Sequence, residues 1–212
     1  MAAPQPVTDR GADAAFLALV ADRATTAGRH RALIEVARTL GRHLGVDLAE
    51  DRLRLFAPLG HPDAGDPTDD RAVPGPPGLP VDAGPGLLGR CLEVLLSDDQ
   101  RTAGAHHTPA WLAARVVTLA LESGGGVRGP AAGWTVCDPA VGGGAFLLAV
   151  ADELHRRGVS EDQVVSQLWG FDTDPLAIAV TETALALWAG GPRPANLHVA
   201  DFLLDAQVER SR

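Results

Sequence analysis

The sequence contains no lysine: all 18 basic residues are arginines, and they stand against 27 acidic residues, for a formal net charge of −9. No basic run stands out along the chain. A module that binds nucleic acid unaided usually presents a cationic face, so this composition argues against independent DNA or RNA binding. The arginine-only usage, together with abundant alanine, glycine and proline, favours a GC-rich bacterial source.

Cysteine is also scarce, since Cys91 and Cys137 are the only two and neither belongs to a CxxC pair. This argues against a disulfide framework or a zinc site and suits a reducing compartment. No apolar run approaches the roughly 18 to 20 residues that a membrane span needs. The start MAAPQPVTDR lacks the basic segment and the apolar block of a signal peptide. We therefore expect a cytoplasmic protein without membrane contact.

The chain divides into three regions by composition. Apolar residues at helical spacing predict helices over residues 12–28 and 31–43, within a helical N-terminal region of residues 1–56. Residues 57–86 hold half of the chain's 16 prolines and predict a Pro- and Gly-rich linker. Residues 87–212 form the third region, in which patterned segments return.

In the third region helices are followed by an alternation of strands and helices. We expect helices at residues 87–96, 110–121, 145–157 and 175–188, and strands at residues 134–137, 168–171 and 197–200. Strands that alternate with helices of this length form parallel sheets through right-handed crossovers. The sequence therefore predicts an α/β fold with three parallel strands, preceded by a helical N-terminal region.

Three glycines in a row follow the first expected strand, in TVCDPAVGGGAFLLAVADEL, residues 135–154. In a doubly wound sheet this loop lies below a helix N-terminus, and glycines let the main chain approach a ligand closely. A flexible turn without a ligand fits Gly142, Gly143 and Gly144 equally well. An ATP-binding P-loop is excluded because no Gly-Lys-Ser/Thr follows, and a dinucleotide fingerprint fits poorly because Leu147 replaces its third glycine.

An acidic residue ends each of the three expected strands: Asp138, Asp172 and Asp201. An acid at the tip of the second strand accepts hydrogen bonds from ribose hydroxyls in nucleoside-binding folds. Asp172 fits that place better than Asp174, which we expect to cap the next helix. Asp201 can accept from the amino group of an adenine with Phe202 against the ring, although taken alone it is a turn residue. Together the three acids indicate a nucleoside with a charged tail.

In this order, GAHHTPAWLA, DPAVGGGAFL, GFDTDP and VADFL resemble the motifs of the N-6 adenine-specific DNA methyltransferases of restriction-modification and phage-defence systems. The segment PGLLGRCLEVLLS also resembles the LGxxYExLL helix of many members. The likeness covers residues 86–204, whereas residues 1–85 carry nothing diagnostic. It implies a Rossmann-like class I methyltransferase that depends on S-adenosylmethionine, of which the three parallel strands form half of the sheet.

The resemblance implies a set of cofactor-binding residues, with no metal and no catalytic residue in this chain. They are His107, Thr108 and Pro109 beside the methionine part of S-adenosylmethionine; Asp138, Pro139, Ala140, Gly142, Gly144 and Phe146 around it; Asp172 at the ribose; and Asp201 with Phe202 at the adenine. The departures are mild: Val141 stands for the usual Cys, Gly143 for Ser and His107 for Tyr. His106 beside His107 has no partner at metal-ligand spacing, so we expect both to be solvated.

Members of this family position the target adenine through an (N/D)PP(Y/F) segment after a fourth strand, and the sequence contains no such tetrapeptide. In the family's 3-2-1-4-5 strand order, the first strand would then lack one neighbour. We therefore expect a methyltransferase domain that is incomplete at its C-terminus, by truncation in preference to division of one enzyme between two chains. Such a chain should bind the cofactor but transfer no methyl group alone.

Two other interpretations stay open. A methyltransferase for proteins or small molecules shares the first three strands, although the HTP segment favours the DNA family. A non-catalytic subunit would instead dock through its open sheet edge on a partner that carries the NPPY or NPPF segment. Whether the chain is an incomplete DNA methyltransferase or a non-catalytic subunit, we expect it to bind DNA only as part of the complete enzyme or with such a partner chain.

Overall fold

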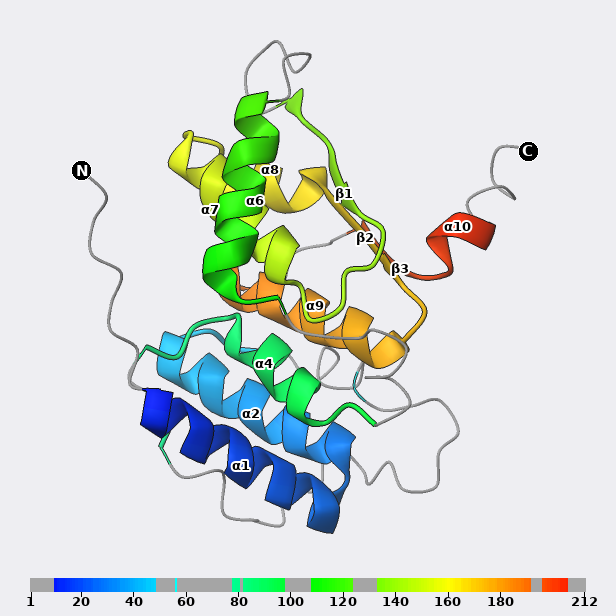
Figure 1. Ribbon diagram of the computed structural model, residues 1–212. Coiled ribbons are helices and arrows are strands. Elements are labelled where there is room, and N and C mark those ends of the chain that lie inside the picture. The colour runs from blue at the N-terminus through cyan, green and yellow to red at the C-terminus, as the bar shows by residue number, and fades with distance from the viewer. Residues whose placement is uncertain are drawn as a thin grey trace.

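The computed structural model describes residues 10–48, 56, 78–80, 82–97, 108–123, 133–191 and 196–205 (Figure 1). In chain order the elements are α1 (Arg10–Ala27), α2 (Arg29–Leu44), α4 (Leu87–Val94), α6 (Ala110–Ser123), β1 (Val136–Asp138), α7 (Ala145–Arg156), α8 (Glu161–Gln167), β2 (Leu168–Asp172), α9 (Pro175–Trp188), β3 (Asn196–Val199) and α10 (Phe202–Asp205). Every expected helix and strand is present, with small shifts at its ends, and the short helices α8 and α10 are additional.

The three strands form one parallel sheet in the order β1-β2-β3. Val136 of β1 pairs with Leu168 of β2, and Trp169 of β2 pairs with Asn196 of β3. Parallel neighbours cannot be joined by a tight turn, and here α7 with α8, and then α9, make the crossovers. The predicted α/β arrangement of three parallel strands is therefore confirmed.

The two faces of the sheet differ in their surroundings. On one face Gly170 lies so close to α7 that an added Cβ would stand 3.2 Å from Leu147 Cδ1. On the other face Trp169 is 37% exposed, and its ring stacks on that of His198 with 5.8 Å between centroids. Leu168 and Gly170 of β2 are buried, whereas Trp169 between them is exposed, so the face that carries Gly170 holds the core.

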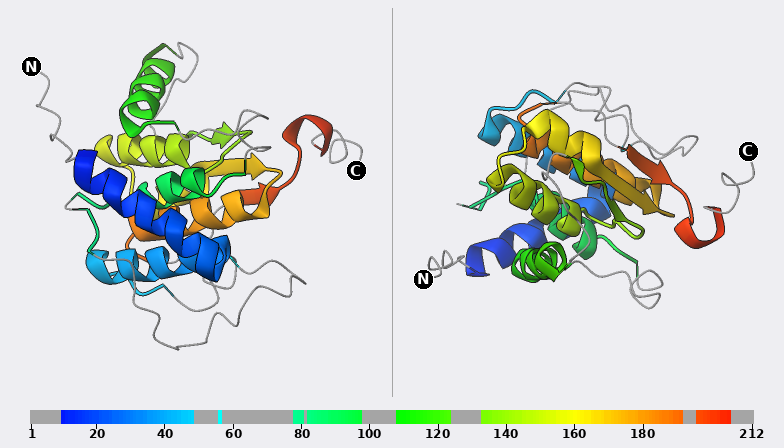
Figure 2. Two further views of the ribbon diagram at one scale, coloured as in Figure 1. Left: turned by 60° about the horizontal axis from the view of Figure 1, so that its bottom comes forward. Right: turned by 90° about the horizontal axis from the view of Figure 1, so that it is seen from above.

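Helix α9 lies between the sheet and the N-terminal helices (Figures 1 and 2). It contacts β2 and β3 on one side and α4 and α2 on the other. Burial on both sides explains why nearly all of its residues are apolar rather than arranged in one stripe. One cluster of buried residues consequently runs from Phe16 of α1 to Leu187 of α9.

The division into three regions stays a prediction, and residues 57–77 of the expected linker lie outside the described residues. Helix α4, at the start of the third region, packs on α1 and α2 of the first. An ion pair between Arg90 and Asp13 joins α4 to α1.

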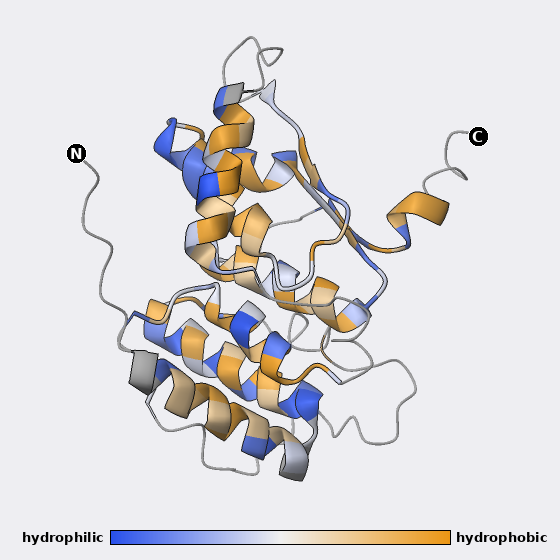
Figure 3. Cartoon of the chain, in the orientation of Figure 1, coloured by the Kyte–Doolittle hydropathy of each residue, from blue (hydrophilic) through white to orange (hydrophobic). Residues whose placement is uncertain are grey.

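Helix α6 packs along α7 and leaves an apolar face outward, as Figure 3 shows by its colour. On this face Trp111 is 60% exposed and Leu119 is 43% exposed. No helix in the described part of the chain has the length and hydropathy that crossing a membrane requires.

Candidate functional site

The three predicted carboxylates lie where the strands of the sheet end. Asp138 and Asp172 are the last residues of β1 and β2, and Asp201 follows β3 directly before α10. The register pairs Asp138 with Gly170, and Asp172 with Val199. Parallel strands end on the same side, so the three acids share the carboxyl edge of the sheet. Their roles in binding stay predictions.

Asp172 fastens the glycine loop to the tip of β2. Its Oδ2 accepts from the backbone N–H of Gly142 at 2.9 Å, and its Oδ1 accepts from that of Asp174 at 2.9 Å. A carboxylate offers about four acceptor positions, so Asp172 keeps acceptor capacity for a ligand hydroxyl. The contact between Asp172 and Gly142 could not be predicted from the sequence, because no local pattern indicates a hydrogen bond between residues so far apart along the chain.

The loop between β1 and α7 is a tight turn that needs glycine. Gly142 and Gly144 have φ angles of 51° and 81°, in the left-handed region where a side chain is disfavoured. The N–H of Val141 donates to the carbonyl of Phe171 at 2.9 Å, so the loop is joined to β2 through its main chain. The predicted glycine turn is confirmed, and its ligand stays a prediction.

Gly143, to which the sequence analysis gave no binding role, marks the contact between the loop and α4. A Cβ on Gly143 would lie 2.5 Å from the Cα of Gly89 in α4. The Ser that is usual in the resembled motif would therefore require α4 or the loop to move. The signal in the sequence was Gly89 itself, within the segment that resembles LGxxYExLL.

The N-terminus of α7 is a second feature of the loop. Gly144 is its N-cap residue, and in the described part of the chain no side chain caps this 12-residue helix. The first N–H groups of a helix have no partner within the helix, and their aligned dipoles favour an anion. This helix start can therefore accept a carboxylate or phosphate oxygen.

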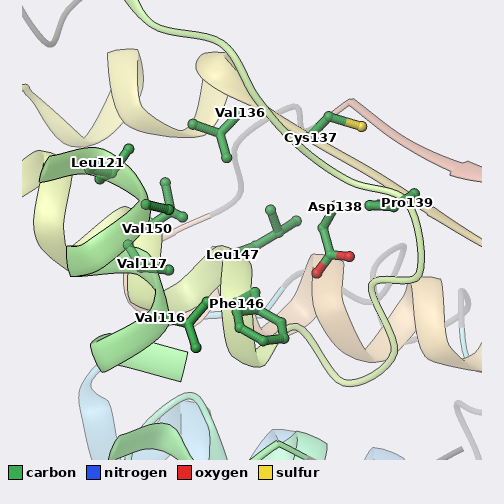
Figure 4. Close-up of a pocket in the computed structure, with 11 residues that line it drawn as sticks. Val116, Val117, Leu121, Val136, Cys137, Asp138, Pro139, Phe146, Leu147 and Val150 are labelled. Atoms are coloured by element: carbon green, nitrogen blue, oxygen red, sulfur yellow. The ribbon is translucent and has the colours of Figure 1, made fainter. Parts of the chain in front are cut away.

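A cavity of about 230 Å³ opens between α6, β1 and the first half of α7 (Figure 4). Its lining residues are Val116, Val117, Ala120, Leu121, Val136, Cys137, Asp138, Pro139, Phe146, Leu147 and Val150. The cavity is thus apolar apart from a thiol and one carboxylate. Of the predicted site residues, it brings together Asp138, Pro139 and Phe146.

The carboxylate of Asp138 is only partly satisfied. Its Oδ1 accepts from the N–H of Ala140 at 3.1 Å, whereas its Oδ2 is buried without a hydrogen-bond partner among the described residues. Burial raises the pKa of Asp138 above its ordinary value, the Ala140 N–H opposes this, and the charge of Asp172 raises it further. A donor or cation supplied by a ligand would relieve this cost.

The remaining predicted residues lie around this loop or beyond it. Thr108 is half-buried and Pro109 exposed, directly before α6, while His107 lies outside the described residues. Oδ1 of Asp201 accepts from the N–H of Leu203 at 2.9 Å, so Asp201 caps α10. Phe202 packs on Phe171 with 5.0 Å between ring centroids.

Asp174 caps α9, as predicted: its Oδ1 accepts from the N–H of Leu176 at 2.8 Å, and Pro175 opens the helix. Within the described ranges, no three His, Cys, Asp or Glu side chains gather as a metal site would require.

Comparison with known proteins agrees with these features. The family model described as N-6 DNA Methylase matches residues 84–211. No curated protein and no solved structure matches the chain. The matched segment begins just before α4 and contains α6, the whole sheet and the glycine loop, whereas α1 and α2 precede it. The chain belongs to the N-6 DNA methylase family.

Proposed function

We propose that residues 84–211 bind S-adenosylmethionine as part of a DNA adenine N-6 methyltransferase of the Rossmann-like class I type. The family match supports adenine in DNA as the acceptor. When bound, S-adenosylmethionine supplies a methyl group on a positively charged sulfur. The residues of this chain bind and orient the cofactor. None is assigned to the target adenine of the DNA, because the sequence contains no (N/D)PP(Y/F) segment.

The observation that carries this proposal is the pairing of two unsatisfied features at the glycine loop. The uncapped N-terminus of α7 offers N–H donors, and Oδ2 of Asp138 is a buried acceptor without a donor in the described part of the chain. The amino-acid end of S-adenosylmethionine carries a carboxylate and an ammonium group, which are complementary to these two features. The residues present therefore fit the cofactor.

The other parts of the cofactor are assigned through the family motifs. Asp172 accepts from the ribose hydroxyls with the acceptor positions that its two backbone contacts leave. Asp201 and Phe202 hold the adenine of the cofactor, and Thr108 with Pro109 and His107 lies beside the methionine part. Transfer to DNA is proposed only together with a polypeptide segment that carries the Asn-Pro-Pro-aromatic sequence.

Calorimetric titration of the purified chain with S-adenosylmethionine tests the proposal, with ATP and NAD⁺ titrated in parallel. We expect saturable binding of S-adenosylmethionine alone. Asp138→Asn, which removes the negative charge, should weaken it by about tenfold or more, equivalent to about 1.4 kcal/mol. Glu161→Gln, at an exposed site in α8, is the matched control and should bind as the unmodified chain does. Retention of ATP or NAD⁺ by a folded chain that ignores S-adenosylmethionine would refute the assignment.

A further inference from the structure

The side chain of Thr181 joins the middle of α9 to the glycine loop. Its hydroxyl donates to the carbonyl oxygen of Gly142 at 2.8 Å, although the two residues lie far apart in the sequence. Thr181 is 0% exposed, so water does not compete for this bond. We propose that Thr181 is a positioning residue for the cofactor loop, an inference that rests on the proposed function of that loop.

Thr181 also packs against Gly144, the N-cap residue of α7. A Cβ on Gly144 would lie 3.0 Å from the Thr181 hydroxyl oxygen and 3.1 Å from its methyl group. The threonine side chain thus fills the space beneath Gly144 while it binds Gly142. Thr181 therefore contacts both glycines of this loop that have left-handed φ angles.

The peptide groups around Gly142 are held from two directions. Its N–H donates to Asp172 at the tip of β2, and its carbonyl accepts from Thr181 in α9. Glycine has little intrinsic preference between left- and right-handed conformations. These two bonds, together with the main-chain bond from Val141 to Phe171, therefore hold the loop in the orientation observed. Without the Thr181 bond, Asp172 is the one described side chain that still binds Gly142. The loop is then less ordered in the free chain and has to become ordered when the ligand binds. That ordering reduces affinity.

A second threonine in the same helix separates this role from ordinary helix packing. Thr183 is also 0% exposed, but its hydroxyl donates to the carbonyl of Ala179 within α9, at 2.8 Å. Such bonding to the preceding turn is the usual way in which a helical threonine satisfies its hydroxyl. Thr181 directs its hydroxyl out of the helix instead. Thr183 is therefore a matched control.

The test compares Thr181→Val, Thr181→Ser and Thr183→Val by titration with S-adenosylmethionine. Valine keeps the shape of threonine but leaves the Gly142 carbonyl without its donor, so Thr181→Val should weaken binding by about tenfold. Thr183→Val should bind within about twofold of the unmodified chain. Thr181→Ser, which keeps the hydroxyl, should restore most of the affinity. If Thr181→Val does not fold, Thr181→Ala replaces it.

Amide hydrogen exchange without ligand provides a readout independent of the cofactor. In Thr181→Val the amides of Gly142 and Gly144 should exchange faster than in Thr183→Val, whereas amides in β2 should not differ between the two. Equal binding losses in the two valine variants, no recovery with serine, or unchanged exchange at Gly142 would overturn the inference. Absence of cofactor binding by the unmodified chain would refute the proposed function, while the exchange data would still decide the role of Thr181.

Discussion

Asp138 is held where its charge destabilises the fold. Burial raises its pKa above the ordinary value of 3.8, and its Oδ2 has no donor among the described residues. An acid whose pKa is higher in the folded state binds its proton more tightly when folded. Protonated Asp138 therefore contributes fully to stability below the unfolded-state pKa, and this contribution is lost as the pH rises through the folded-state pKa. Retaining a carboxylate at such a cost is expected of a ligand-binding group.

This sign gives a prediction for Asp138→Asn. The variant stays neutral, so it should lack the loss of stability that ionisation of Asp138 causes. The free energy of unfolding of the variant, relative to the unmodified chain, should rise as the pH increases from about 3 towards neutrality. Urea denaturation at a series of pH values measures the difference. A difference that stays flat or falls with pH would contradict the raised pKa.

At the scale of elements, local patterns predicted what local forces determine. The glycine turn, the Asp174 cap and the largely apolar α9 could be recognised because spacing and capping chemistry act within a few residues. Helix α8, EDQVVSQ, was missed because it is too short to show a helical period. Helix α10 was missed for the same reason.

Contacts between distant elements could not be predicted in this way. The approach of Gly143 to Gly89 and the bond from Thr181 to Gly142 depend on how α4 and α9 pack around the loop. A hydrophobic stripe shows that a helix is covered but not which element covers it. The carboxyl edge with its three acids was predictable because parallel strands place their ends together by construction.

Because the glycine loop contacts α4, we predict that serine at position 143, the residue usual in the resembled motif, destabilises this chain. Gly143→Ser adds a Cβ at 2.5 Å from the Gly89 Cα, and backbone cannot move aside as a flexible side chain does. We expect a loss of about 1–3 kcal/mol in the free energy of unfolding. Gly133→Ser is the control, since its Cβ meets nothing within 4 Å. Urea denaturation measures the free energy of unfolding of both variants. Equal values would show that α4 moves aside at little cost and would contradict the prediction.

At the scale of the whole molecule, α4 links the N-terminal helices to the sheet layer. Cys91 of α4 is completely buried, and burial raises its pKa to about 12. Cys137 on β1 is exposed, although partial burial and the charge of Asp138 raise its pKa as well. The two thiols therefore differ in access, and Cys91 reports whether α4 leaves the core.

Thiol alkylation should distinguish these two cysteines. In the native chain iodoacetamide should modify Cys137, faster as the pH rises, and leave Cys91 unmodified until the chain unfolds. Cys137→Ser isolates Cys91, and mass spectrometry follows its modification with time. Addition of S-adenosylmethionine should slow any reaction at Cys91, because the glycine loop contacts α4. Rapid native modification of Cys91 would show that the N-terminal helices separate from the sheet layer.

Charge over the whole molecule predicts how the chain meets DNA. The net charge is −9, and several arginines already bind carboxylates: Arg23 to Glu35, Arg90 to Asp13, and Arg156 and Arg157 to Glu153. Affinity for duplex DNA arises chiefly from Lys and Arg side chains that neutralise phosphates and release counterions. The slope of the logarithm of the binding constant against the logarithm of the salt concentration measures how many phosphates are neutralised. We therefore expect the chain alone to bind a labelled duplex no tighter than about 10⁻⁴ M near physiological salt, with a salt slope near zero.

Fluorescence anisotropy over a salt series, with and without S-adenosylmethionine, measures both the affinity and its salt slope. A steep slope would reveal a cationic surface that the acidic balance of the sequence conceals, and DNA binding would then belong to this chain rather than to a partner segment.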